Sequence, residues 1–211
     1  GARQLFEMLT SSGALESWIT ADFFNPVSEA GQRVVTCHAD FKPNNIIKSE
    51  EGLLQVIDYD FTYVGLAAVD MSFALCHWLT QATFEDRFAF FEAYLRCSGA
   101  PFDAMNVKKL MLDAEICRLA DFSSPFWAAW HSTRCGQCPR NHVLLHADTF
   151  DGIGWFALWK ELIEKIRAAP ALQEEVVQKG LFTCVMDHDD FQVKEFLLRT
   201  NEKGERHCWW R

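Results

Sequence analysis

The segment CHADFKPNNIIKSEEGLLQVIDYD runs from Cys37 to Asp60 and carries most of the residues on which the fold and the chemistry of the chain depend. Two short apolar runs, at residues 34–37 and 53–57, border a polar loop and predict two short strands. The residues Glu-Glu-Gly at 50–52 predict a tight turn between them. Packing alone does not explain the carboxylates and carboxamides of the loop, so we interpret the segment as one site.

Asp40 lies in this loop between an apolar run and Pro43, which hold the loop at both ends. A carboxylate placed in this way can accept a proton from an incoming hydroxyl, so Asp40 is the candidate general base. Asn45 and Asp58 offer oxygen ligands of the kind that suit Mg²⁺. The combination indicates phosphoryl transfer, in which the protein mainly positions groups and neutralises charge. Each residue taken singly also fits an ordinary role in a turn or a helix cap.

The loop resembles that of choline and ethanolamine kinases and of their aminoglycoside phosphotransferase relatives. Residues 38–47 are similar to the motif H-x-D-x-x-x-x-N, and residues 56–60 to the motif I-D-[YWF]-[DE]. Further along, the resemblance includes an acidic helix start, a C-E-W-like segment and an F-x-W-x-x-W-like segment, at residues 69–71, 76–78 and 126–130. It extends over roughly residues 33–165, and the first motif is its most specific part.

The resemblance implies an α+β, mostly helical fold: a protein-kinase-like C-terminal lobe with a small β element at the catalytic loop. It implies that Asp40 is the base and that Asn45 and Asp58 bind Mg²⁺ and, through the metal, ATP. His38 is interpreted as a brace of the catalytic loop through hydrogen bonds, because Asp40 already fills the role of base.

The residues expected around the substrate also follow from the resemblance. Asp60 matches an acidic position near the substrate, and Trp127 and Trp130 match aromatic residues that enclose a quaternary ammonium. Indole faces attract cations, whereas an aromatic pair at helical spacing also fits an ordinary core, and both interpretations stand. His77 replaces a Glu that helps to hold the cation, so a less charged alcohol or amine is expected to gain preference. Asn44 stands where the family usually has Gly. It is expected to tighten or reshape the catalytic turn, because Asn adopts a left-handed backbone less freely than Gly.

The composition narrows the class of partner. The 211 residues carry a net charge of −9, which argues against nucleic acid and against an anionic membrane as partners and suits a small, cationic alcohol substrate. No apolar stretch approaches the length of a bilayer crossing, and the first residues lack the apolar core of a signal peptide. We therefore expect a cytoplasmic protein without a membrane partner. The sequence leaves open whether the chain forms a homodimer.

One kinase-like C-terminal lobe is expected over residues 1–211. Residues 1–32 form a leading helix and linker, residues 33–65 the catalytic and metal-binding segment, and residues 66–211 a helical substrate subdomain with an insertion near 131–150. The chain shows no Gly-rich strand pair with a downstream strand Lys, so the N-terminal lobe of a kinase is expected to be absent.

Helices dominate the second half of the predicted structure. Apolar residues three to four positions apart predict helices over residues 69–79, 84–97, 106–122 and 154–167. Asp70 is interpreted as the acidic start of the first of these, favoured there by the helix dipole.

A separate cluster has the residue types of a zinc site. Cys135, Cys138, His142 and His146 follow His131 closely, and C-x2-C followed by His is compatible with zinc. The gap between the Cys pair and the His pair is much shorter than in a zinc finger. We favour an ordinary insertion loop, with zinc as the alternative.

The function predicted from the sequence is ATP- and Mg²⁺-dependent phosphorylation of the hydroxyl of a small amino alcohol, choline or ethanolamine. An aminoglycoside-type or other small-molecule kinase is an alternative, and the Trp pair discriminates against it because acidic surfaces typically meet polyamine sugars. A catalytically inactive, kinase-like binding module is the other alternative, and the presence of Asp40, Asn45 and Asp58 argues against it.

Overall fold

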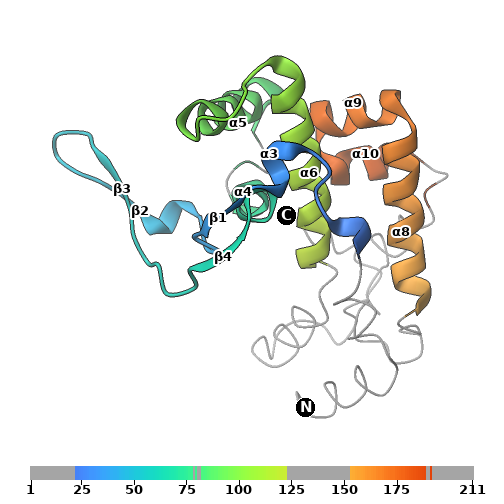
Figure 1. Ribbon diagram of the computed structural model, residues 1–211, viewed down its shortest axis with the longest axis horizontal. Coiled ribbons are helices and arrows are strands. Elements are labelled where there is room, and N and C mark those ends of the chain that lie inside the picture. The colour runs from blue at the N-terminus through green and yellow to red at the C-terminus, as the bar shows by residue number, and fades with distance from the viewer. Residues whose placement is uncertain (1–21, 78, 80–81, 123–152, 189–190, 192–211) are drawn as a thin grey trace, which may run out of the picture. The chain divides into compact units, whose positions relative to one another are not determined.

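The computed structural model describes residues 22–77, 79, 82–122, 153–188 and 191 (Figure 1). These residues belong to two compact units. Residues 25–119 and 173–181 fall in one unit, which holds the predicted catalytic loop, and the other described residues fall in the second. The described part is mostly helical, with two small antiparallel sheets, which confirms the predicted α+β class.

The predicted catalytic segment is built on two strand pairs. Strand β1 (Val34–Cys37) pairs antiparallel with β4 (Tyr63–Leu66), and β2 (Ile46–Lys48) pairs antiparallel with β3 (Leu54–Val56). The two predicted strands, at residues 34–37 and 53–57, therefore exist but belong to different sheets. The sequence analysis missed β2 and β4, because β2 has only two apolar residues before Lys48 and the run of β4 is interrupted by Gly65.

The predicted turn at residues 50–52 is confirmed. Gly52 donates its backbone N–H to the Ser49 carbonyl at 3.0 Å, and Leu53 O accepts from Ser49 N at 2.8 Å. Gly52 has a φ of +85°, a conformation that glycine adopts without steric cost. The turn closes the β2–β3 hairpin (Figure 1).

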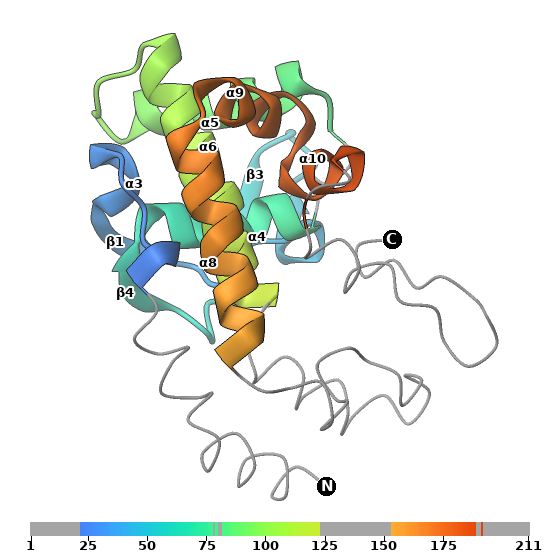
Figure 2. The same cartoon turned by 90° about the vertical axis from the view of Figure 1, so that its right-hand side faces the viewer.

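The helices of the unit with the catalytic loop follow the predicted periodicity closely. Helix α3 (Glu29–Gln32) precedes β1 and packs against α4 (Ala67–His77), as Figure 2 shows. Helix α5 (Phe84–Cys97) matches its predicted range, and α6 (Ala104–Phe122) begins two residues earlier than predicted.

Helix α6 supplies the core of this unit, and residues 110–119 are all buried. Polar side chains in this stretch form hydrogen bonds with other parts of the chain. The fully buried carboxylate of Asp113 accepts hydrogen bonds from Val27 N at 3.0 Å and from Ser28 N at 2.8 Å. Ser28 in turn caps α3, because its hydroxyl accepts from Gly31 N at 3.0 Å. The linker that leads into β1 is therefore anchored to the core.

The other unit contains η1 (Asp22–Phe24) and α8 (Ile153–Ala168), which pack against each other (Figure 2). The buried residues Trp159, Leu162, Ile163 and Ile166 lie on one stripe of α8, as a helix of period 3.6 requires. The predicted helix at 154–167 is thus confirmed.

The sequence analysis missed two short helices, α9 (Pro170–Lys179) and α10 (Leu181–Asp187), which follow α8. The predicted break at Ala169–Pro170 is correct, but it separates two helices. Proline suits the first position of a helix, where its missing N–H would have no partner. None of the helices in the described residues has the length and apolar character that a membrane crossing needs.

Several predictions concern residues outside the described part. They are the helix at the start of the chain, the substrate residues Trp127 and Trp130, and the Cys and His cluster between 131 and 146. The division of residues 1–211 into one lobe with a catalytic segment and a substrate subdomain stays a prediction.

Candidate active site

The structure brings Asp40 and Asn45 into direct contact. Asn45 ends the short helix η2 (Pro43–Asn45), and its Nδ2 donates to Asp40 O at 2.9 Å and to Asp40 Oδ2 at 3.0 Å. Both partner atoms are acceptors, so the amide nitrogen must face Asp40 and the Asn45 carbonyl oxygen, Oδ1, faces away. Asn45 is buried, whereas the Asp40 side chain is half-buried.

His38 ties this loop to the chain that precedes Asp58. Its Nδ1 accepts from Asp40 N at 3.3 Å, so Nε2 carries the proton and donates to Ile57 O at 2.9 Å. Ile57 N donates in turn to Asn45 O at 2.9 Å. The hydrogen bonds that the sequence predicted for His38 are therefore present. His38 and Asn45 together hold the backbone C=O and N–H of Ile57, the residue before Asp58.

Asp58 and Asp60 follow β3 in the chain. Asp58 has a φ of +66°, and Asp is among the few residues other than Gly that adopt this left-handed conformation locally. Both side chains are exposed, and neither carboxylate has a protein partner among the described residues. Tyr59, between them, packs its ring on His38 with centroids 4.7 Å apart. The carboxylate of Asp58 is thus available to a ligand beside the loop.

Asp70 lies in the first turn of α4, where the sequence predicted an acidic residue, and it also makes a contact that the sequence did not predict. It is the fourth residue of α4 and does not cap the helix, and its Oδ1 accepts from Ala39 N at 3.0 Å across 31 positions of sequence. Ala39 has a φ of +64°, which costs an L-residue roughly 1–2 kcal/mol. The buried Asp70 carboxylate therefore holds the residue before Asp40 in a strained conformation. An acidic residue in an otherwise apolar helix start was visible in the sequence, but it did not distinguish this role from a favourable contact with the helix dipole.

Lys42 is a second residue that the sequence analysis missed. Its Nζ lies 2.6 Å from Asp40 Oδ2, and 33% of its side chain is exposed. A Lys two positions after the predicted base was the available signal. The replacement of Gly by Asn44 does not strain the turn, because η2 is right-handed and, among the described non-Gly residues, positive φ occurs at Ala39 and Asp58.

Cys37, at the end of β1, is buried directly before this loop. Burial raises the pKa of the Cys37 thiol, and the negative charge of Asp70 raises it further, against a smaller opposing effect of a hydrogen bond with Tyr63. A thiol with a raised pKa carries little thiolate near neutral pH. Cys37 therefore belongs to the scaffold of the site and is a poor nucleophile.

The remaining substrate residues are not located by the structure. His77 is the last residue of α4, but its side chain lies outside the described atoms. The same holds for Trp127 and Trp130. The aromatic wall around an ammonium group therefore stays a prediction.

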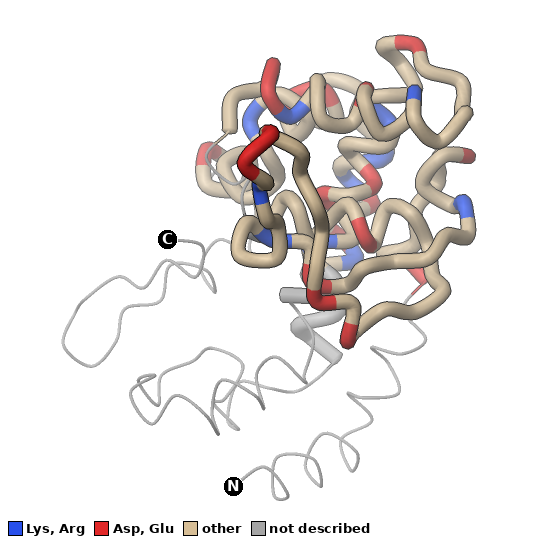
Figure 3. The backbone as a smooth tube through the Cα atoms, turned by 90° about the vertical axis from the view of Figure 1, so that its left-hand side faces the viewer, with Lys and Arg blue, Asp and Glu red and all other residues tan. Residues whose placement is uncertain are grey.

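Charge along the catalytic segment is strongly asymmetric. Between Val34 and Asp70 the sequence has six Asp or Glu residues and only two Lys or Arg residues, Lys42 and Lys48. Figure 3 marks the acidic positions in red and the basic positions in blue. This excess of negative charge suits a divalent cation at the site.

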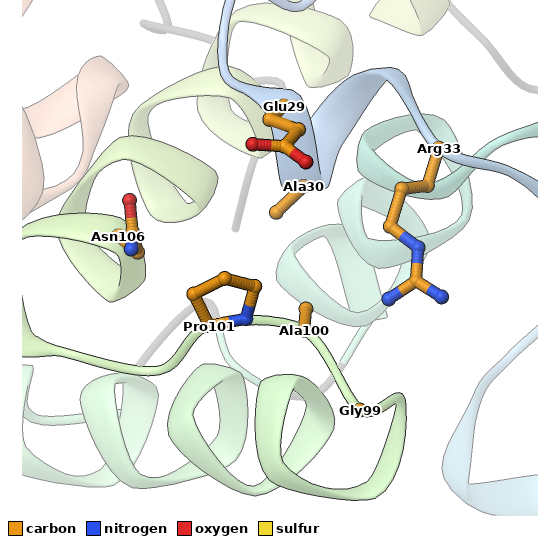
Figure 4. Close-up of a pocket in the computed structure, with 7 residues that line it drawn as sticks. All are labelled: Glu29, Ala30, Arg33, Gly99, Ala100, Pro101 and Asn106. Atoms are coloured by element: carbon orange, nitrogen blue, oxygen red, sulfur yellow. The ribbon is translucent and has the colours of Figure 1, made fainter.

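A separate pocket of about 140 Å³ lies in the unit that holds Asp40 (Figure 4). Glu29 lines it from α3, Arg33 from the position directly after α3, and Asn106 from α6. Ala100 and Pro101 line it from the connection between α5 and α6. The predicted site residues are not among those that line it, so we do not assign it to catalysis.

A mostly helical α+β fold in which a loop Asp contacts an Asn five residues later is consistent with the kinase-like phosphotransferases. Comparison with known families narrows this class. Residues 5–145 match the family model of choline/ethanolamine kinase, which is about two-thirds of the chain. The chain belongs to the choline/ethanolamine kinase family, and this membership indicates a small-molecule kinase. No curated protein matched the chain.

Proposed function

We propose that this protein transfers the terminal phosphoryl group of ATP, with Mg²⁺, to the hydroxyl of a small amino alcohol of the choline or ethanolamine class. The observation that carries the proposal is the hydrogen-bonded network of the catalytic loop. Asn45 contacts Asp40 through its amide and Ile57 through its backbone, and Asp58 follows Ile57 directly. Family membership supports the same activity.

The donor atoms of the site fit Mg²⁺. Asn45 turns its Oδ1 away from Asp40, and the Asp58 carboxylate is exposed, so two oxygen ligands are available without breaking any contact given above. Mg²⁺ usually takes one or two carboxylates and completes its shell with water and substrate phosphates. A metal held by Asn45 and Asp58 would neutralise charge on the phosphates of ATP.

Asp40 is proposed to accept the proton of the acceptor hydroxyl on its carboxylate as the oxygen attacks. Asn45 and Lys42 hold the Asp40 carboxylate in one orientation through Oδ2. Asp70 and His38 hold the backbone on either side of it, at Ala39 N and Asp40 N. The reaction then depends chiefly on positioning, as expected for phosphoryl transfer.

The test measures ADP release from ATP and Mg²⁺ with choline, ethanolamine and a panel of aminoglycosides as acceptors. Asp40→Asn should abolish turnover and leave thermal unfolding unchanged, because the amide keeps the shape of the side chain but cannot serve as the base. Asp86→Asn, on the exposed surface of α5, is the matched control and should retain activity.

Either of two results would reject the proposal. Turnover retained by Asp40→Asn removes Asp40 as the base. Release of ADP with aminoglycosides but not with choline or ethanolamine replaces the proposed acceptor by the alternative one.

A further inference from the structure

Lys42 is a positive charge in direct contact with the candidate base. Its Nζ lies 2.6 Å from Asp40 Oδ2, the same oxygen that accepts from Asn45 Nδ2 at 3.0 Å. The Lys42 backbone is extended, with φ −139° and ψ 161°, which is the conformation favoured before a proline such as Pro43. The geometry therefore holds the ammonium group of Lys42 at the carboxylate that must meet the acceptor hydroxyl.

The distance between Lys42 and an acceptor of the proposed class is short. A hydroxyl that gives its proton to Asp40 lies within about 3 Å of the carboxylate. In choline and ethanolamine only two carbons separate the hydroxyl from the nitrogen. The positive nitrogen therefore lies within about 9 Å of Lys42 Nζ, a separation comparable with the Debye length of about 8 Å at physiological salt. Two like charges at this separation repel each other measurably.

We propose that Lys42 acts as a charge filter at the acceptor end of the site. It lowers the affinity for an alcohol whose ammonium lies two carbons from the reacting hydroxyl, relative to an uncharged alcohol of the same shape. The inference rests on the proposed function, because it requires Asp40 to meet the acceptor hydroxyl. It makes Lys42 a determinant of how strongly the site prefers a cationic amino alcohol over an uncharged one, and it weakens that preference in the same direction as the replacement of Glu by His77.

The ratio of kcat/KM for a cationic acceptor to kcat/KM for an uncharged one separates this role of Lys42 from others. A Lys42 that only supported the loop, or only assisted the transfer of the phosphoryl group, would change the reaction with every acceptor by the same factor. A charge filter acts on the cationic acceptor alone. Choline and its uncharged isostere, in which a tert-butyl group replaces the trimethylammonium group, have the same shape and differ in charge.

The experiment compares these two acceptors in the wild-type chain, in Lys42→Gln and in Lys42→Met as a second neutral variant. Both kcat/KM and, by titration calorimetry without turnover, the dissociation constant are measured for each acceptor. Lys48→Gln makes the same charge change at the end of β2 and serves as the matched control. Lys42→Arg keeps the positive charge.

In the neutral Lys42 variants we expect the preference for choline over its isostere to rise about fivefold, equivalent to about 1 kcal/mol. The partial exposure of Lys42 limits the effect to this order. Lys42→Arg and Lys48→Gln should each leave the ratio within about twofold of wild type, because neither removes a charge beside Asp40.

A ratio that stays within about twofold in both neutral Lys42 variants overturns the charge filter. An equal rise in Lys48→Gln overturns it too, because the effect would then come from the net charge of the protein. If the wild-type chain transfers phosphate to neither acceptor nor to any other alcohol of the panel, the proposed function fails and the filter fails with it.

Discussion

Replacing Asp70 by Ala removes the acceptor of the 3.0 Å hydrogen bond from Ala39 N. The carboxylate is buried, so water replaces it poorly. A hydrogen bond to a charged group contributes about 1.5–3 kcal/mol, and in the wild type it offsets the roughly 1–2 kcal/mol that the left-handed conformation of Ala39 costs. Relaxation of Ala39 recovers part of that cost. We therefore expect the free energy of unfolding of Asp70→Ala to fall by about 2 kcal/mol.

Urea unfolding measures this change, and two further variants calibrate it. Asp70→Asn keeps an oxygen acceptor without the charge, so a loss of about 1 kcal/mol is expected. Ser72→Ala is the control on the same helix, because the Ser72 hydroxyl is buried but donates to Val69 O within α4, at 2.6 Å. It should cost less than about 1 kcal/mol, since a hydroxyl bonded back to its own helix adds little stability.

The same substitution should affect catalysis more than stability. Once Ala39 is released, Asp40 shifts, and a displacement near 1 Å at a reacting group costs about a hundredfold in rate. The kcat of Asp70→Ala should therefore fall by about this factor, with a small change in KM. The reasoning is refuted if Asp70→Ala unfolds within about 0.5 kcal/mol of wild type, the range of ordinary surface substitutions, and keeps its kcat.

Two further predictions concern other buried groups of the unit that holds Asp40. Glu115→Gln should lower the free energy of unfolding by about 3–5 kcal/mol, because it leaves the buried guanidinium of Arg87, now 3.2 Å from Glu115 Oε1, without its counter-charge. A loss below about 1 kcal/mol in urea unfolding would show that this pair contributes little. The raised pKa of Cys37 keeps its thiol protonated as the pH increases, so iodoacetamide should label the exposed Cys97 well before Cys37 at about pH 8. Equal labelling of the two residues, measured by peptide mass spectrometry, would contradict the burial of Cys37.

Local pattern was sufficient for much of the fold. The helix at 84–97 and the strand at 34–37 were predicted with the bounds that the structure has, and the turn at 50–52 was predicted correctly. Each of these depends on residues close in sequence, through apolar periodicity or the backbone freedom of Gly52. The residues Asp40 and Asn45 were also predicted to belong to one site, and the structure places them in contact.

The tertiary structure decided the parts of the site that depend on distant residues. Strand β1 pairs with β4 and not with the apolar run at 53–57, and Asp70 reaches Ala39 from 31 positions away. Nothing in the local pattern of α4 distinguishes a helix-capping Asp from one that holds another loop. The sequence by itself therefore determined the local elements, the family motif and the identity of the candidate base. Only the fold could place Asp70 behind that base, because the free energy of a contact between distant segments depends on how the whole core packs.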